Sequence, residues 1–184
     1  MKALLRGLVP VIAALVLGGT AMAADLENTL YLDVPAGRVM IELRPDLAPD
    51  HVAQIKALAR RGFYDGVPFH RVIDGFMAQT GDPTGTGTGG SGHKLKAEFS
   101  GEKHVRGTTS MARATDPNSA DSQFFIMFAP APSLDGQYTI WGKVASGMEY
   151  IDQVKKGDQA RNGVVANPDK IVKMQVAADA EKAK

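Results

Sequence analysis

The sequence has no cysteine, no internal repeat and almost no net charge. Without cysteine, disulfides contribute nothing, so the folded chain has to rely on its buried core. Lys2 and Arg6 are two of its 21 basic residues, which leaves 19 basic against 20 acidic residues beyond residue 23. A body this close to neutral argues against electrostatic binding of nucleic acid.

The chain also lacks a linker that would divide it. With 184 residues, of which 44% are hydrophobic and 22% charged, it is long enough to close a substantial core. We therefore expect a single domain over residues 24–184. No amphipathic stripe is left over for a partner, so a monomer is expected.

The first 23 residues form a pattern of their own. A basic start at Lys2 and Arg6 precedes an apolar run over residues 8–17 and a small-x-small pair, Ala21 and Ala23. This order is typical of a secretory signal peptide, and it predicts cleavage after Ala23 and export to a bacterial periplasm. The alternative is an uncleaved membrane anchor. The run is shorter than the ~20 residues that span a bilayer, which favours cleavage and no stable membrane insertion afterwards.

The rest of the chain mixes strand and helix periods. Alternating apolar residues predict a strand pair over residues 26–43, and helical spacing predicts helices over 45–62 and 147–156. Further strands are expected at residues 94–99, 105–111, 124–128, 138–144 and 171–176, followed by a frayed tail over 177–184. Many short strands with only two helices predict a mainly β fold, an antiparallel barrel with helical caps.

Residues 67–82, VPFHRVIDGFMAQTGD, are expected to form a β-hairpin that turns at Asp74 and Gly75. Residues two apart on a strand share a face, so Met77 and Gln79 point the same way. Residues 122–128, SQFFIMF, follow the same rule, with Gln123, Phe125 and Met127 on one face and Phe124, Ile126 and Phe128 on the other. One face has to be core, and the other places an amide beside aromatic rings.

Several shorter patterns are typical of other functions, but the residues around them do not support those functions. The loop over residues 84–92 contains the glycine spacing of a dinucleotide fingerprint, but no strand extends into it and no long amphipathic helix follows. Ser91 lacks the full Gly-x-Ser-x-Gly elbow of serine hydrolases. The histidines show neither ligand spacing nor clustered carboxylates, and the strand methionines show no soft-metal arrangement, so no metal site is expected.

At residues 69–82 the chain resembles the cyclophilins, the peptidyl-prolyl cis/trans isomerases. The stretch FHRVI-x-GFM-x-Q-x-GD matches that family's signature, and the resemblance spans residues 26–177. Further matches are GTGTGG at 85–90, SMA at 110–112, SQFFI at 122–126, LDG at 134–136 and WGKV at 141–144. The resemblance implies a closed eight-stranded antiparallel barrel capped by two α-helices. It also implies action on X-Pro bonds in unfolded or partly folded polypeptides.

Isomerisation breaks no bond, so it requires no nucleophile, metal or cofactor. Rotation about a peptide bond costs ~18–20 kcal/mol because the amide loses its resonance. In the twisted amide the prolyl nitrogen regains a lone pair, and a charged donor such as Arg71 stabilises that state selectively. Gln79 on the facing strand can hold the guanidinium, and an apolar pocket disfavours the planar amide.

The resemblance implies a role for each matching residue. Arg71 and Gln79 are expected to be catalytic, with Gln79 supporting Arg71. Substrate binding is expected from Phe76, Met77, Ala112, Arg113, Gln123, Phe125, Leu134 and Tyr138. The proline pocket consists of Phe76, Met77, Phe125 and Leu134, while Gln123 supports the site and the backbone of Ala112 and Arg113 holds the residue before proline. Taken singly, each apolar residue is better explained by core packing, and only the joint pattern favours a site.

Three positions depart from the family's pattern. Many members have Asn where this chain has Arg113, a change that a backbone contact tolerates. Many eukaryotic members have Trp where this chain has Ser133, and His where it has Tyr138. Because that Trp contacts the drug, we expect weak cyclosporin binding.

Two other functions stay open on the sequence. A binding module would hold proline-containing segments in the same groove as a chaperone or assembly factor, with isomerisation incidental. Such a module requires the pocket but not a charged donor, so Arg71 favours the enzyme. No motif addresses a protein that engages host partners, and none identifies the natural clients or the preferred residue before proline.

Overall fold

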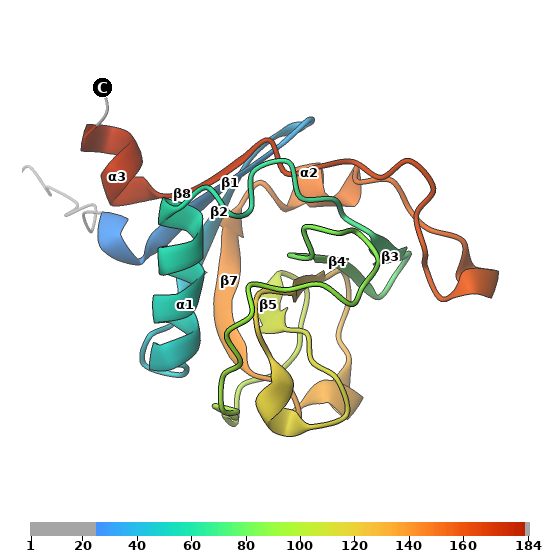
Figure 1. Ribbon diagram of the computed structural model, residues 1–184, viewed down its shortest axis with the longest axis horizontal. Helices are drawn as coiled ribbons and strands as arrows, with labels where there is room; N and C mark the ends of the chain where they lie inside the picture. Colours follow the sequence, from blue (N-terminus) through green and yellow to red (C-terminus); the bar gives the residue numbers. More distant parts are fainter. Residues whose placement is uncertain (1–24, 183–184) are drawn as a thin grey trace, which may run out of the picture.

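The computed structural model describes residues 25–182, so the predicted signal peptide over residues 1–23 lies outside the described part of the chain. Eight antiparallel strands form one sheet in the order β3-β4-β6-β5-β7-β2-β1-β8 (Figure 1). The strands are β1 (Thr29–Val34), β2 (Gly37–Leu43), β3 (Arg71–Ile73), β4 (Met77–Thr80), β5 (Thr108–Met111), β6 (Phe124–Met127), β7 (Ile140–Ser146) and β8 (Lys173–Val176). The prediction of a mainly β fold with eight antiparallel strands is confirmed.

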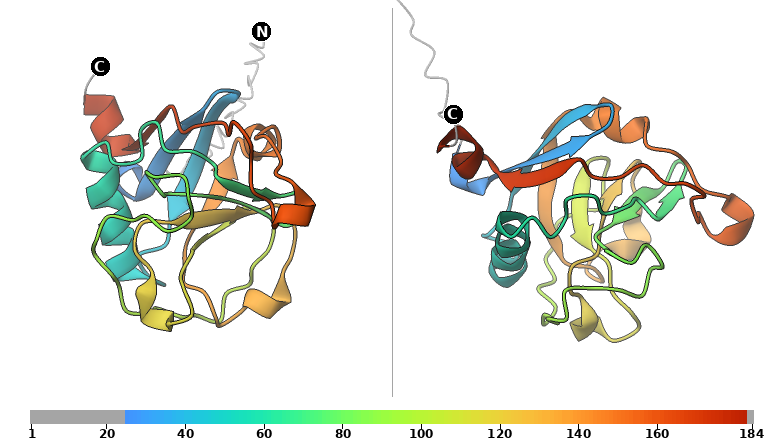
Figure 2. Two further views of the ribbon diagram at one scale, coloured as in Figure 1. Left: turned by 45° about the vertical axis from the view of Figure 1, so that its right-hand side comes forward. Right: turned by 45° about the horizontal axis from the view of Figure 1, so that its top comes forward.

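The sheet is curled but open, so the prediction of a closed barrel is wrong (Figure 2). The segments leading into its two edge strands, β3 and β8, do meet: Gly66 N–H donates to Ile171 O at 2.8 Å, and Ile171 N–H donates to Val67 O at 2.9 Å. The pairing runs on past Pro68, opposite Lys170, to Phe69, whose N–H donates to Asp169 O at 2.9 Å, but β3 and β8 themselves are not paired. The two edges therefore touch only where the chain enters them, and the sheet remains a half-barrel.

Two helices lie where the sequence predicted them, α1 (Pro49–Arg60) and the shorter α2 (Met148–Asp152). α1 starts with proline, whose fixed φ suits a first turn, and it ends before Gly62, which takes a positive φ of 66°. Its predicted apolar stripe is buried, and the helix lies alongside β8 and β7 (Figure 1). The described residues also contain four short 3₁₀ helices, η1 (Leu26–Asn28), η2 (Pro117–Ser119), η3 (Pro132–Leu134) and η4 (Gln159–Arg161). Within residues 25–182, no helix has both the length and the apolar character to cross a membrane.

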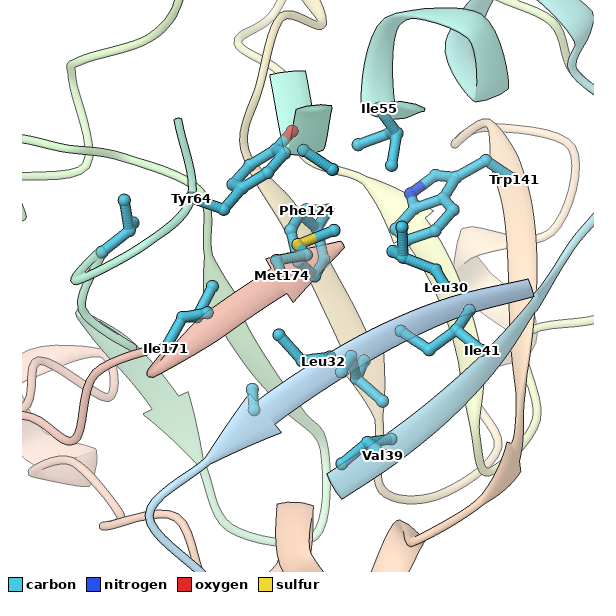
Figure 3. Close-up of a cluster of buried hydrophobic side chains, with 14 of the residues drawn as sticks. Leu30, Leu32, Val39, Ile41, Ile55, Tyr64, Phe124, Trp141, Ile171 and Met174 are labelled. Atoms are coloured by element: carbon cyan, nitrogen blue, oxygen red, sulfur yellow. The ribbon is translucent and has the colours of Figure 1, made fainter. Parts of the chain in front are cut away.

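The main core lies between the sheet and the helices (Figure 3). Trp141 and Phe124 meet edge to face with ring centroids 5.3 Å apart, and Tyr64 meets Phe124 in the same way at 5.6 Å. Such aromatic contacts contribute about 0.5–1.5 kcal/mol beyond the burial of area. The Tyr64 hydroxyl donates to Ser122 O at 3.1 Å, so its buried polar end is satisfied.

Strand β6 separates two apolar clusters. Phe124 and Ile126 belong to the main core, whereas Phe125 and Met127 pack in a second cluster with Met77. The predicted alternation of faces is therefore confirmed. One face of β6 stabilises the fold, and the other face is available to line a functional site.

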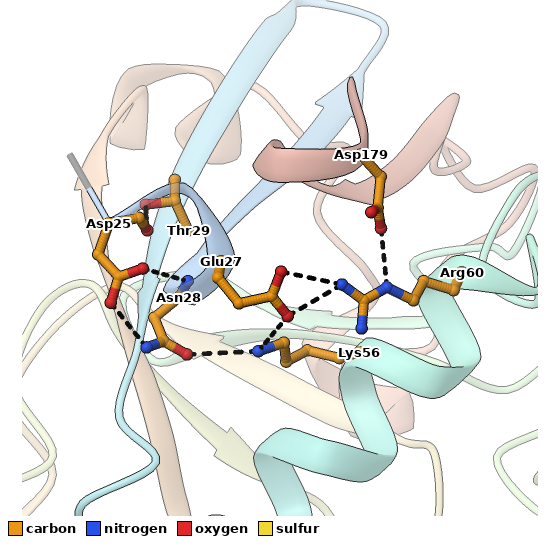
Figure 4. A network of polar contacts seen from close by, with 7 residues as sticks. All are labelled: Asp25, Glu27, Asn28, Thr29, Lys56, Arg60 and Asp179. Atoms are coloured by element: carbon orange, nitrogen blue, oxygen red, sulfur yellow. Dashed lines mark hydrogen bonds and ion pairs between the residues drawn. The ribbon is translucent and has the colours of Figure 1, made fainter. Parts of the chain in front are cut away.

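The C-terminal segment is a helix, α3 (Ala177–Lys182), where the sequence predicted a frayed tail. Arg60 of α1 links it to η1: Nε donates to Asp179 at 2.8 Å and Nη2 donates to Glu27 at 2.9 Å (Figure 4). Lys56 also contacts Glu27, at 2.8 Å. Hydrogen bonds from Lys56 and then Arg60 lower the pKa of Glu27 to about 2. These contacts join three segments that are distant in sequence, which local patterns do not reveal.

Residues 94–99 are not the predicted strand, because only Leu95 forms a bridge, to Ala120. Instead, this segment brings Glu98 to the start of α1, whose N-cap residue Ala48 offers no side-chain hydrogen bond. The Glu98 carboxylate accepts from the N–H groups of Asp50 at 3.2 Å and His51 at 3.1 Å, and it lies 2.6 Å from His51 Nδ1. A carboxylate from another segment thus takes the place of the missing cap.

Replacing Glu98 by alanine is expected to lower the free energy of unfolding by about 1–3 kcal/mol, because it leaves the amide donors of α1 without their acceptor. Urea unfolding measures the change. Glu102→Ala, an exposed glutamate four residues further on, is the control and should change stability little. Equal effects of the two substitutions would contradict the capping role.

Candidate active site

A cavity of about 190 Å³ opens on the face of β4 and β6 that points away from the main core. It is lined by Arg71, Phe76, Met77, Gln79, Ala112, Arg113, Phe125, Leu134 and Tyr138. Gln123 lines an adjoining cavity of about 420 Å³, which shares Gln79, Ala112 and Arg113 with the first. The structure thus gathers all ten residues that the sequence singled out.

Strand register sets the order of these side chains. Arg71 on β3 pairs with Gln79 on β4, and Gln79 pairs with Phe125 on β6. Met77 follows the same rule and lies opposite Met127. Because paired residues share a face, a charged group, an amide and an aromatic ring lie next to one another across three strands.

A series of hydrogen bonds begins at Arg71 and crosses the site. Arg71 Nη1 donates to Gln79 Oε1 at 3.1 Å, and Gln79 Nε2 donates to Gln123 Oε1 at 3.0 Å. Gln123 Nε2 then donates to the carbonyl oxygens of Gly87 at 3.0 Å and Gly89 at 2.9 Å. The side-chain amides of Gln79 and Gln123 can therefore each adopt only one orientation. The Arg71 guanidinium is held by a network that ends at the backbone of the loop containing Gly87 and Gly89.

That loop, residues 84–92, is organised by the buried carboxylate of Asp82. Asp82 accepts hydrogen bonds from the N–H groups of Thr84 at 2.7 Å, Gly87 at 2.6 Å and Gly89 at 3.1 Å. Burial raises the pKa of Asp82, but the hydrogen bonds from Thr84, Gly89 and Gly87 outweigh it and lower the pKa to about 2. Gly89 has to be glycine, because a Cβ there would lie 2.2 Å from the Asp82 carboxylate.

The apolar wall is built on Phe125. Tyr138 meets its ring edge to face at 5.7 Å, and the buried His104 stacks on it with centroids 6.2 Å apart. Arg113, expected to contribute only its backbone, also places its guanidinium 4.6 Å from the centre of the Tyr138 ring. Arg113 Nε and Nη2 donate to the carbonyl of Gln137, which fixes this stack in place.

Two residues in contact with the site were missed by the sequence analysis. Asn162 accepts from Arg71 twice, from Nε to its carbonyl oxygen at 3.0 Å and from Nη2 to Oδ1 at 2.9 Å. His104 lies beneath Phe125, with Nδ1 3.1 Å from Asp135 and Nε2 3.1 Å from Ser110 Oγ. Burial lowers the pKa of His104, although Asp135 acts in the opposite direction. Neither residue belongs to a local pattern, and Asn162 is 91 positions from Arg71.

No carboxylate within residues 25–182 forms an ion pair with Arg71. Its partners are the neutral oxygens of Gln79 and Asn162 and, at 3.9 Å, the sulfur of Met77. Burial lowers the pKa of Arg71, yet a guanidinium remains protonated at neutral pH. Nor do three or more His, Cys, Asp or Glu side chains gather as a metal site anywhere in residues 25–182. The site is therefore a fixed positive charge beside the apolar wall of the cavity.

Asp82→Asn is expected to lower the free energy of unfolding at neutral pH by about 1–3 kcal/mol, because an amide cannot accept from every donor that the carboxylate satisfies. The pKa of Asp82 is depressed in the folded state, so its contribution is complete above the unfolded pKa of about 4 and disappears as the pH falls towards about 2. Urea unfolding across this range should show the two proteins converging in stability. Asp74→Asn, at an exposed turn, is the control. A difference that persists unchanged at the acid end would contradict the account.

Comparison with known proteins places this geometry in one family. The family model described as cyclophilin type peptidyl-prolyl cis-trans isomerase/CLD matches residues 29–176. A probable peptidyl-prolyl cis-trans isomerase of Brucella suis is 59% identical over 172 residues, which cover 87% of this chain and 88% of that protein. Peptidyl-prolyl cis-trans isomerase B of Bacillus subtilis is 47% identical over 135 residues, which cover 72% of this chain and 94% of that protein.

Solved structures agree with these matches. A cyclophilin from Hirschia baltica superimposes with a TM-score of 0.75 at 29% identity, covering 84% of this chain and 76% of that one. A Cryptosporidium parvum cyclophilin type peptidyl-prolyl cis-trans isomerase, crystallised in the presence of the dipeptide Ala-Pro, gives a TM-score of 0.74 at 32% identity. The match covers 80% of this chain and 98% of that one. The chain therefore belongs to the cyclophilin-type peptidyl-prolyl cis-trans isomerases.

Proposed function

We propose that this isomerase acts on X-Pro bonds of unfolded or partly folded exported polypeptides, with Arg71 as the group that donates to the prolyl nitrogen. The observation that carries the proposal is that the Arg71 guanidinium, held by neutral oxygens, lies beside the apolar wall of the cavity. The barrier of ~18–20 kcal/mol arises from amide resonance. A catalyst therefore has to stabilise the twisted amide more than the planar one.

The donor geometry supports this role. One N–H of Arg71 Nη2 is used by Asn162 Oδ1, which leaves the other for a substrate atom in the cavity. As the amide twists, its nitrogen becomes pyramidal and gains a lone pair that accepts this hydrogen bond. The planar amide offers no such lone pair, so the interaction lowers the barrier and does not merely bind the substrate.

The apolar side of the cavity is proposed to hold the proline ring. Met77 is 1% and Phe125 5% exposed, and Phe76 and Leu134 pack against the same cluster at its rim. Apolar walls exclude water, which favours the less charge-separated twisted amide. A relative crystallised in the presence of Ala-Pro supports a site for this dipeptide in the family. Gln123, Ala112 and Arg113 would then hold the chain on the adjoining side, towards the larger cavity.

Arg71→Ala is expected to lower kcat/KM for an Ala-Pro peptide by about 100-fold or more, the usual cost of removing one transition-state donor. Peptide affinity should change far less, because the apolar walls remain. NMR exchange spectroscopy measures the isomerisation rate and the affinity in one sample. Arg38→Ala, which removes an exposed arginine paired with Asp33 on the β1–β2 hairpin, should leave both unchanged.

Equal losses of rate and affinity in Arg71→Ala would contradict the proposed role of the guanidinium. If the wild type binds the peptide but does not accelerate exchange, the groove is a binding site and the chaperone-type alternative replaces the enzyme.

The cellular place of this activity is proposed from the pattern of residues 1–23. We propose a periplasmic monomer that requires no cofactor, binds no nucleic acid and is free of the membrane once the signal peptide is removed. The clients would be proline-containing chains that fold after export.

Expression of the full chain in a Gram-negative host is expected to yield a periplasmic protein whose first residue is Ala24. N-terminal sequencing of the periplasmic fraction tests this. A variant with Ala21→Leu and Ala23→Leu should remain uncleaved, because the small residues before the cleavage site are lost. Wild-type protein that keeps Met1 and fractionates with the membrane would establish the anchor instead.

A further inference from the structure

Residues 157–163 form a loop that lies against the outer edge of β3 (Figure 1). Gly157 N–H donates to Val72 O at 2.8 Å, and Val72 N–H donates to Gly163 O at 2.8 Å, so the loop takes up the hydrogen bonds of an edge strand. A Cβ at Gly157 would lie 1.9 Å from Gly163 O, and one at Gly163 would lie 2.4 Å from Ile73. This close packing fixes the loop beside Arg71.

Asn162 has an unusual backbone at the end of η4, where the loop returns to β3. Its φ of 55° and ψ of 37° lie in the left-handed region. Glycine adopts this region freely, and among the other residues asparagine and aspartate do so at the lowest cost. In this conformation its carbonyl oxygen accepts from Arg71 Nε and its side-chain Oδ1 accepts from Nη2. Both acceptors thus come from one residue and contact one edge of the guanidinium.

The choice of asparagine meets two demands at once. Glycine would keep the backbone conformation but would lose Oδ1. Aspartate would keep an acceptor but would add a negative charge that pairs with Arg71. Asparagine is neutral, as are the other partners Gln79 and Met77, so the guanidinium is held on two edges without losing its charge.

We propose that Asn162 is a positioning residue for isomerisation, which holds the Arg71 guanidinium against the cavity while leaving its charge for the substrate. This inference rests on the proposed role of Arg71. An arginine side chain has several rotatable bonds, and one contact to Gln79 fixes only one of its edges. Asn162 fixes the opposite edge, so the remaining N–H groups stay directed at the cavity.

Asn162→Gly is expected to lower kcat/KM for an Ala-Pro peptide by about tenfold, because a misplaced catalytic group loses rate steeply with distance. Peptide affinity and the melting temperature should stay close to the wild-type values, since glycine adopts the same backbone. Asn167→Gly is the matched control, because Asn167 also has a positive φ, of 52°, at an exposed position outside the cavity lining. It should leave the rate unchanged.

A double-mutant cycle separates positioning from a general structural effect. In the Arg71→Ala background, Asn162→Gly should cause no further loss of rate, because the group on which it acts is gone. An additive loss in the double variant, or a wild-type rate in Asn162→Gly, would overturn the inference. The Arg71→Ala variant alone tests the proposed function, so a failure there is distinguishable from a failure at Asn162.

Discussion

Arg71 keeps an unpaired positive charge in a half-buried position, and the arrangement of the site follows from that constraint. If a carboxylate were paired with the guanidinium, the attraction of the guanidinium for the lone pair that develops on the prolyl nitrogen would be weaker. Here amide and carbonyl oxygens hold it, from Asn162 on one side and from Gln79 on the other. The Gln79 amide is in turn fixed by Gln123 and by the loop that Asp82 organises. A buried anion thus supports the network from a distance without touching the guanidinium.

The sheet keeps this site separate from the part of the molecule that provides stability. Phe124 packs on Trp141 in the main core, whereas its neighbour Phe125 faces the cavity. Successive residues of one strand therefore serve different purposes because a strand alternates its faces. The cavity beside Phe125 can stay unfilled, since the main core is complete on the other side of the sheet. Irregular segments between the strands add the remaining residues of the site, such as Arg113 and Leu134 in the cavity lining and Asn162 beside Arg71.

The features that the sequence predicted well depend on local pattern. The hairpin at Gly75, the faces of β6 and the stripe of α1 follow from periods of two and of 3.6 residues. Features that depend on distant contacts were predicted wrongly or missed. The segment around Glu98 has strand-like composition, but its carboxylate caps a helix 48 positions away. The helix α3 is held by Arg60, and the edge strands β3 and β8 meet only through the segments that lead into them. Asn162 is one polar residue in a polar loop, and only the fold brings it to Arg71.

A crystal structure of the mature domain with a bound X-Pro peptide would test the central claim most directly. The account predicts the proline ring between Met77 and Phe125, with an Arg71 guanidinium nitrogen within about 3.5 Å of the prolyl nitrogen. Arg71 should still be held by Gln79 and Asn162. A proline ring bound elsewhere, or a guanidinium turned away from the prolyl nitrogen, would contradict it.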